Sequence, residues 1–106
     1  MQVRYFRNHW SIPDADTQGK YPLLESYLSG DVQSSPNTCL WLLERIDEIK
    51  SGKIFELVST GNAHTLTLRP NCVLIESEYT EGKEVCTLEL DEFEHIIRGW
   101  MQFVSP

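Results

Sequence analysis

The residues with the clearest chemical character are carboxylates near the C-terminal end of the chain. Residues 76–94 contain eight acids and the single base Lys83, and this balance of −7 equals the net charge of the whole 106-residue chain. Four of these acids surround a predicted hairpin turn at Glu81-Gly82, namely Glu76, Glu78, Glu81 and Glu84. Alternate residues of a strand point to one face, so we expect Glu76 and Glu78 to project together.

Carboxylates held close together repel one another unless a cation or a basic partner neutralises them. The acidic run therefore predicts a surface that binds a basic protein, since clustered charge speeds encounter and rejects wrong partners. A solvated surface is the alternative, and for the acids at 91–94 the dipole of a following helix accounts for part of the charge. A calcium loop fits poorly because the DxDxDG spacing is missing. We expect no metal ion and no cofactor.

Two aromatic residues have no obvious place in a core. Tyr79 lies within the acidic hairpin, and Tyr and Trp are over-represented among residues that anchor interfaces. Trp41 projects away from the apolar face of its predicted helix, so we expect it either at the partner surface or packed under residues 8–38. By contrast, Phe55, Phe93 and Trp100 are predicted to lie in the core.

No catalytic motif is present. The chain has no glycine-rich phosphate loop, no HExxH and no GxSxG. His64 in a strand and His95 on a helix are interpreted as surface or packed residues. The three cysteines lack CxxC spacing and resemble small apolar residues of a strand or helix: Cys39, Cys72 and Cys86. We expect no enzyme, with a small cysteine-dependent enzyme as the alternative if a thiol has a lowered pKa and a histidine in reach.

Size and composition limit the class of protein. A chain of 12.3 kDa forms one domain over residues 1–106. An isoelectric point near 4.8 disfavours direct nucleic-acid binding. The longest apolar stretch, Leu40-Trp41-Leu42-Leu43, is far shorter than the ~20 residues that span a bilayer. The N-terminus does not resemble a secretory signal, so we expect a cytoplasmic protein without a membrane partner.

Hydrophobic periodicity predicts the elements that position these side chains. We expect a strand at 2–7, an irregular segment at 8–38 with a short helix near 22–28, and a helix at 37–50 capped by Asn37 or Thr38. The apolar face of that helix comprises Cys39, Leu42, Leu43, Ile46 and Ile49. Between 53 and 90 the period changes to two, which predicts strands joined by short turns.

A final helix begins at Asp91, which we predict as its N-cap with Glu94 as the capping-box partner. Its apolar face comprises Phe93, Ile96, Ile97, Trp100 and Val104. Gly99 interrupts this face, which predicts that something packs closely there. The expected fold is α+β, an antiparallel four- to five-stranded meander sheet with two helices packed on one face.

Four segments resemble a known class of protein: GNAHTLTL at 61–68, VLIE at 73–76, LELDEF at 88–93 and WMQF at 100–103. Over residues 52–104 the chain resembles small bacterial immunity proteins that protect a cell from its own polymorphic or contact-dependent growth-inhibition toxin. The resemblance implies a cytosolic protein that binds the C-terminal domain of a cognate toxin and blocks its active site. Many such toxins are nucleases with basic clefts, which an acidic hairpin would fill as a phosphate mimic. A housekeeping adaptor for another basic partner is the alternative.

Overall fold

The main sheet has four antiparallel strands in the order in which they occur along the chain. The computed structural model describes residues 1–79 and 84–106. The strands are β3 (Leu57–Thr60), β4 (His64–Arg69), β5 (Cys72–Ser77) and β6 (Val85–Leu88). Each strand pairs with the next, so the predicted antiparallel meander is confirmed.

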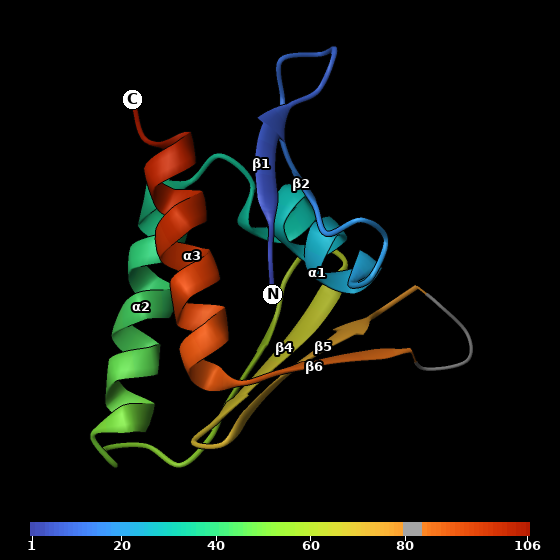
Figure 1. The fold of residues 1–106 in the computed structure, drawn as a ribbon. Coiled ribbons are helices and arrows are strands. Elements are labelled where there is room, and N and C mark those ends of the chain that lie inside the picture. The colour runs from blue at the N-terminus through green and yellow to red at the C-terminus, as the bar shows by residue number, and fades with distance from the viewer. Residues whose placement is uncertain (80–83) are drawn as a thin grey trace.

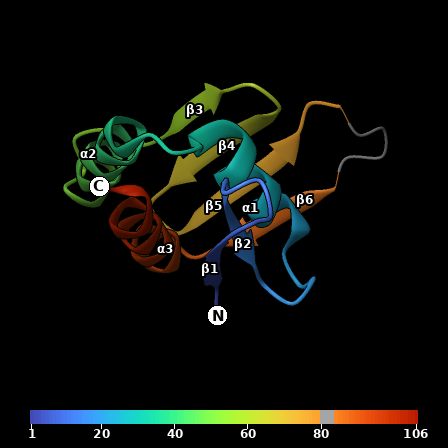
Figure 2. The same ribbon diagram turned by 90° about the horizontal axis from the view of Figure 1, so that it is seen from above.

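The helices lie on one face of this sheet. They are α1 (Pro22–Tyr27), which continues into a π-helical turn, η1 (Leu28–Val32), and the longer α2 (Pro36–Lys50) and α3 (Leu90–Val104). Figures 1 and 2 show α2 and α3 side by side, and α1 packs against β5 and β6. The two predicted helices of the α+β fold are therefore α2 and α3, and α1 is the short helix expected near 22–28.

Sequence reasoning missed a second, smaller sheet. β1 (Arg4–Arg7) pairs antiparallel with β2 (Pro13–Asp16), so part of the segment 8–38 predicted to be irregular is a strand. The hairpin between them turns through Ser11, which has a positive φ of 60°. The tip of this hairpin extends beyond the rest of the chain (Figure 1).

The core lies between the inner, helix-covered face of the sheet and the three helices. Strand residues that alternate along the sequence supply the inner face: Leu66, Leu68, Val73, Ile75, Cys86 and Leu88. Trp100 and Phe93 are fully buried, as predicted, and the Trp100 indole donates a hydrogen bond to the Gln33 carbonyl oxygen at 2.8 Å. The prediction that Phe55 lies in the core is wrong. This residue precedes β3, and its side chain is 83% exposed.

Both predicted helix caps are wrong by a few residues. The N-cap of α2 is Ser35, whose Oγ accepts the Thr38 backbone N–H at 3.1 Å, and Pro36 begins the helix because proline fits the first helical position. α3 has Glu89 as its N-cap, without a side-chain capping bond. Asp91 therefore lies inside the first turn, where its carboxylate pairs with Lys50 of α2.

Gly99 does mark a close approach. A Cβ built on Gly99 would lie 2.8 Å from the Tyr5 hydroxyl oxygen. The same hydroxyl donates a hydrogen bond to the Ile96 carbonyl oxygen at 3.0 Å. The glycine thus lets β1 rest directly on α3 and ties the small sheet to the main body.

Candidate functional site

The outer face of the main sheet is not covered by any helix in the described part of the chain. Its side chains form rows across the strands, because Val58 pairs with Thr67 and Thr67 with Leu74. The next row joins Thr60, Thr65, Glu76 and Val85. Val58 is 57% exposed and Val85 is 46% exposed, so this face presents apolar surface to solvent.

Glu76 and Glu78 lie together at one end of this outer face. Glu76 on β5 lies opposite Thr65 on β4, and Glu78 follows the end of β5. The Thr65 hydroxyl donates a hydrogen bond to the Glu78 carboxylate, and the Thr60 hydroxyl lies 3.0 Å from that of Thr65. This row of hydroxyls holds Glu78 against the sheet, which supports the expectation that the two glutamates project together.

Neither carboxylate has a lysine or arginine partner among the residues that the structure describes. Within residues 1–79 and 84–106, no lysine or arginine nitrogen lies within 4.0 Å of a Glu76, Glu78 or Glu84 carboxylate.

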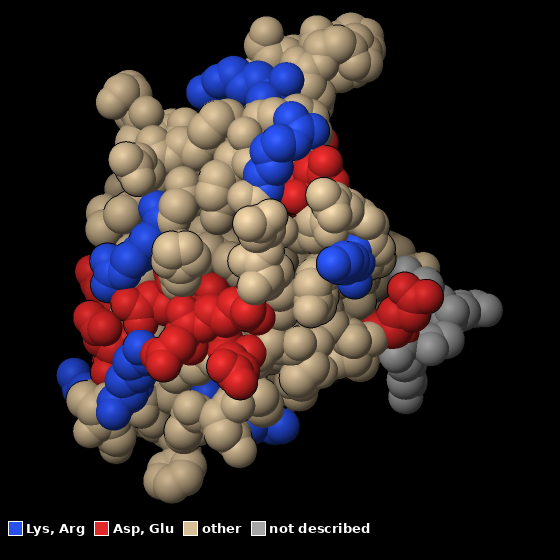
Figure 3. Space-filling model, viewed as in Figure 1, with Lys and Arg blue, Asp and Glu red and all other residues tan. Residues whose placement is uncertain are grey.

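The acids of the final helix behave differently. Lys50 pairs with both Asp91 and Glu94, and Arg98 lies 2.9 Å from Glu94. Figure 3 shows acidic and basic side chains intermingled over the lower parts of α2 and α3. Hydrogen bonds from Lys50 and Arg98 lower the pKa of the Glu94 carboxyl. Among the residues that the structure describes, the acidic run thus divides into an ion-paired cluster on the helices and hairpin glutamates without a lysine or arginine partner.

Tyr79 and Trp41 border the same turn from different sides. The Tyr79 side chain is 79% exposed, and its hydroxyl donates a hydrogen bond to the Asn62 carbonyl oxygen at 3.1 Å. Trp41 is 38% exposed and lines a small hollow of about 80 Å³ with Gly61 and Tyr27. The β3–β4 turn therefore links both aromatic residues that the sequence assigns to partner binding.

The remaining predicted residues do not join this cluster. Glu84 is exposed and lines a shallow cavity of about 380 Å³ together with Lys20 and Pro22, on the α1 side of the sheet. Glu81 lies outside the described residues. The hairpin acids thus do not all share one face, since Glu84 lies apart from Glu76 and Glu78.

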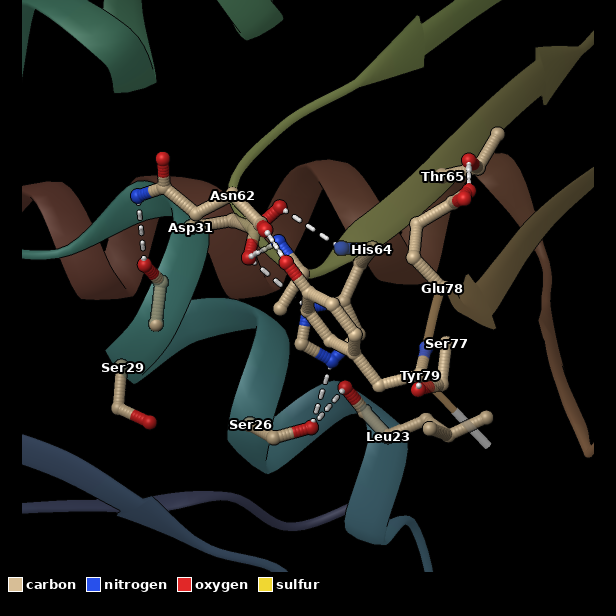
Figure 4. A network of polar contacts seen from close by, with 12 residues as sticks. Leu23, Ser26, Ser29, Asp31, Asn62, His64, Thr65, Ser77, Glu78 and Tyr79 are labelled. Atoms are coloured by element: carbon tan, nitrogen blue, oxygen red, sulfur yellow. Dashed lines mark hydrogen bonds and ion pairs between the residues drawn. The ribbon is translucent and has the colours of Figure 1, made fainter. Parts of the chain in front are cut away.

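A network of polar contacts lies behind the β3–β4 turn, and sequence reasoning missed it (Figure 4). Asp31 of η1 lies with its Oδ1 2.8 Å from His64 Nδ1, and His64 Nε2 lies 2.8 Å from the Ser26 hydroxyl oxygen. The Asp31 carboxylate also accepts the backbone N–H groups of Ala63 and His64, both at 3.2 Å. His64 and Asp31 have side chains only 6% and 5% exposed, whereas Ser26 is exposed.

No signal in the sequence could have revealed this network. His64 is 33 residues from Asp31 and 38 residues from Ser26 along the chain, and each of these residue types is common. Only the folding of η1 against the start of β4 brings them together. His64 is a packed residue, as predicted, but it is packed among hydrogen-bond partners.

Cys39 and Cys86 lack the environment of a reactive thiol. Burial raises the pKa of the Cys39 thiol to about 11, and burial also raises the pKa of Cys86. A nucleophilic cysteine needs the opposite shift. These two shifts speak against a reaction through Cys39 or Cys86.

Among residues 1–79 and 84–106, no three His, Cys, Asp or Glu side chains are grouped so as to hold a metal ion. None of the helices in these ranges has the length and apolar character needed to cross a membrane. Comparison with protein-family models, with curated proteins and with solved structures finds no match.

Proposed function

We propose that this chain is a cytoplasmic immunity protein that binds the basic C-terminal domain of a cognate toxin, in the first instance a nuclease. Glu76, Glu78 and Tyr79 form the acidic end of the binding surface. The observation that carries the proposal is that Glu76 and Glu78 share an uncovered sheet face and have no lysine or arginine partner within the described residues. A basic partner would supply that missing countercharge.

Electrostatic attraction raises the rate at which this surface associates with a basic partner and makes the surface selective for such partners. Two carboxylates on one face attract a basic cleft and repel acidic proteins, and steering of this kind raises association rates by roughly 10- to 1000-fold at low salt. Glu84, which lies apart from these two glutamates, adds to the negative charge of the molecule without sharing their face. Inhibition then follows from occlusion, because carboxylates seated in a phosphate-binding cleft exclude the nucleic-acid substrate.

Apolar contact supplies the remaining affinity. Tyr79 is 79% exposed, and Val58 and Val85 lie exposed on the same sheet. Interfaces combine a few such aromatic or aliphatic anchors with a polar rim. Trp41, on the other side of the β3–β4 turn, extends the surface toward α2.

An adaptor for another basic protein is the second candidate, because the same surface would serve it. The two candidates differ in what they bind and in what binding does to the partner. A pull-down from the native host at low and high salt, followed by mass identification, separates them. Recovery of a toxin domain that is released at high salt supports immunity, whereas recovery of a housekeeping protein supports the adaptor.

A growth assay then tests inhibition directly. Expression of the recovered toxin domain should arrest growth, and co-expression of this chain should restore it. The Glu76→Gln/Glu78→Gln variant should rescue less well, while Asp47→Asn/Asp91→Asn, which removes two charges from exposed helix positions, should rescue like the wild type. Equal rescue by both variants would contradict the acidic-surface proposal.

A further inference from the structure

We propose that Ser26, His64 and Asp31 form a nucleophilic site at which Ser26 accepts an acyl group from a small carboxylic ester. Two contacts of 2.8 Å define this site, one between Asp31 Oδ1 and His64 Nδ1 and one between His64 Nε2 and the Ser26 hydroxyl oxygen. A serine, a histidine and a carboxylate in this order of contact are the parts of an activated nucleophile, which is recognised by geometry and roles and not by sequence position. The inference is independent of the proposed partner binding.

The contacts assign the proton positions. Asp31 accepts two backbone N–H groups and faces Nδ1, so Nδ1 of the imidazole carries the proton that this carboxylate accepts. In the neutral ring Nε2 then holds a lone pair directed at Ser26, and the serine hydroxyl donates to it. The Leu23 carbonyl oxygen, 3.2 Å from the Ser26 hydroxyl oxygen, is the alternative acceptor when His64 is charged.

The three side chains differ in exposure as this reaction requires, because the base and its carboxylate are buried and the nucleophile is exposed. The His64 and Asp31 side chains are almost completely enclosed, and the ring of Tyr27 packs edge-on against His64 with centroids 5.9 Å apart. Enclosure fixes the imidazole and keeps its contact with the carboxylate free of water. Ser26 alone is exposed, so an ester can reach the hydroxyl from solvent.

A shallow cavity near Ser26 indicates the class of ester. Leu23 offers its carbonyl to the Ser26 hydroxyl and also lines the cavity of about 380 Å³, with Tyr21, Pro22 and Val85 as further walls. Leu23 precedes Ser26 by three residues, so this wall of the cavity lies about one helical turn from the nucleophile along α1. These apolar walls suit a short acyl chain, and Lys20 and Glu84 add charged groups to the same lining.

The reaction balances without a cofactor. The Ser26 oxygen forms a bond to the ester carbonyl carbon while its proton passes to His64 Nε2. The carbon–oxygen bond to the alcohol then breaks, and the proton on Nε2 passes to the departing oxygen. Water, deprotonated by the same nitrogen, releases the acid and restores the Ser26 hydroxyl.

Ser51 provides a matched internal control. It is exposed at the end of α2, and its hydroxyl donates to the carbonyl oxygen three residues earlier, Glu48, at 3.2 Å, as Ser26 does to Leu23. No histidine contacts Ser51 in the described part of the chain. The two serines therefore share exposure and local helical geometry and differ in the imidazole.

The test measures covalent modification of the intact chain by p-nitrophenyl butyrate and by a fluorophosphonate probe, with mass mapping of the modified residue. Ser26 should react roughly 100-fold faster than Ser51, the order expected from a positioned general base. Ser26→Ala should abolish the fast modification and Ser51→Ala should leave it unchanged. His64→Gln should slow it by a similar factor.

The outcome can overturn the proposal even if a variant fails to fold. Circular dichroism shows whether His64→Gln retains the native structure. If it does not, the modification rates of Ser26 and Ser51 in the wild-type chain test the proposal on their own. Equal rates at the two serines, or modification mapped elsewhere, would show that the network is only a structural tether. Ser26→Ala should still bind the toxin domain, so failure of one proposal is distinguishable from failure of the other.

Discussion

The Asp31 carboxylate and the His64 imidazole meet at 2.8 Å, and both side chains are almost completely enclosed. This contact joins η1, which follows the first helix, to the first residue of β4. The same carboxylate also accepts two backbone N–H groups of the β3–β4 turn. A single acidic side chain thus fixes the turn that Trp41 and Tyr79 border.

Removing this carboxylate should destabilise the fold. Asp31→Ala leaves two partly buried backbone donors and the buried His64 ring without their acceptor, and a fully buried unsatisfied group costs about 1–3 kcal/mol. We expect the free energy of unfolding to fall by about 3 kcal/mol in urea denaturation. Asp47→Asn on the exposed side of α2 is the control and should change it by less than about 0.5 kcal/mol. A change that small for Asp31→Ala would mean that the network contributes no net stability.

The contact between Gly99 and Tyr5 reverses a common rule for helices. Glycine to alanine inside a helix normally stabilises it by about 1 kcal/mol. At Gly99 the new Cβ would lie 2.8 Å from the Tyr5 hydroxyl oxygen, so Gly99→Ala should instead lower the free energy of unfolding by about 1–2 kcal/mol. Thermal and urea unfolding measure this change.

The Tyr5→Ala background is the test of that explanation. With the ring removed, Gly99→Ala should become stabilising or neutral, because nothing opposes the added methyl group. A Gly99→Ala penalty of equal size in both backgrounds would show that the Tyr5 contact is not its cause.

The Glu94 ion pairs should make stability depend on pH. Lys50 and Arg98 hold the pKa of this carboxyl below its usual range, so the folded state binds the proton less readily than the unfolded chain. The resulting stability is present above the ordinary pKa of glutamate and is lost as the pH falls through the lowered value. Because solvent screens the pair, its size is modest, roughly 0.5 kcal/mol.

The Glu94→Gln variant measures this contribution. It should be less stable than the wild type at pH 7, and the difference should shrink as the pH is lowered toward 3. High salt should reduce the difference at pH 7. A difference that stays constant over this pH range would show that the charge of Glu94 contributes nothing.

The buried indole of Trp100 ties α3 to the end of η1. Its N–H donates to the Gln33 carbonyl oxygen at 2.8 Å, and Gln33 has a positive φ of 59°. Trp100→Phe leaves that carbonyl without its donor and opens a cavity, so we expect a loss of about 2–4 kcal/mol in the free energy of unfolding. Trp10→Phe at the exposed hairpin tip is the control and should be nearly neutral. A neutral Trp100→Phe would contradict the assigned role of the hydrogen bond.

Much of the fold could be predicted because its signals are local. The apolar periodicity of 37–50 and 91–104 and the alternation in 64–69 follow from burial on one face, and the helices and strands are found there. The caps were misplaced because Ser35 and Glu89 lie just before the periodic residues. Phe55 was misplaced because its alternation with Leu57 extends past the point where the sheet begins.

The candidate sites depend on contacts between distant parts of the chain. The alternation of strand residues predicts Glu76 and Glu78 on one face, although β5 itself ends at Ser77 and Glu78 follows it. The sequence could not separate Glu84 from them, because that depends on how α1 lies against β6. It also could not reveal the pairing of Lys50 with Asp91 and Glu94, or the meeting of Ser26 and Asp31 with His64.

The central claim is that the charges of Glu76 and Glu78 draw a basic toxin domain to the outer face of the sheet. The most direct measurement is the association rate constant with that domain by stopped flow, at 20 mM and 500 mM salt. At low salt Glu76→Gln/Glu78→Gln should associate about tenfold more slowly than the wild type and depend less on salt, while Asp47→Asn/Asp91→Asn should retain most of the wild-type rate. Equal rates and equal salt dependence for the two double variants would contradict the claim.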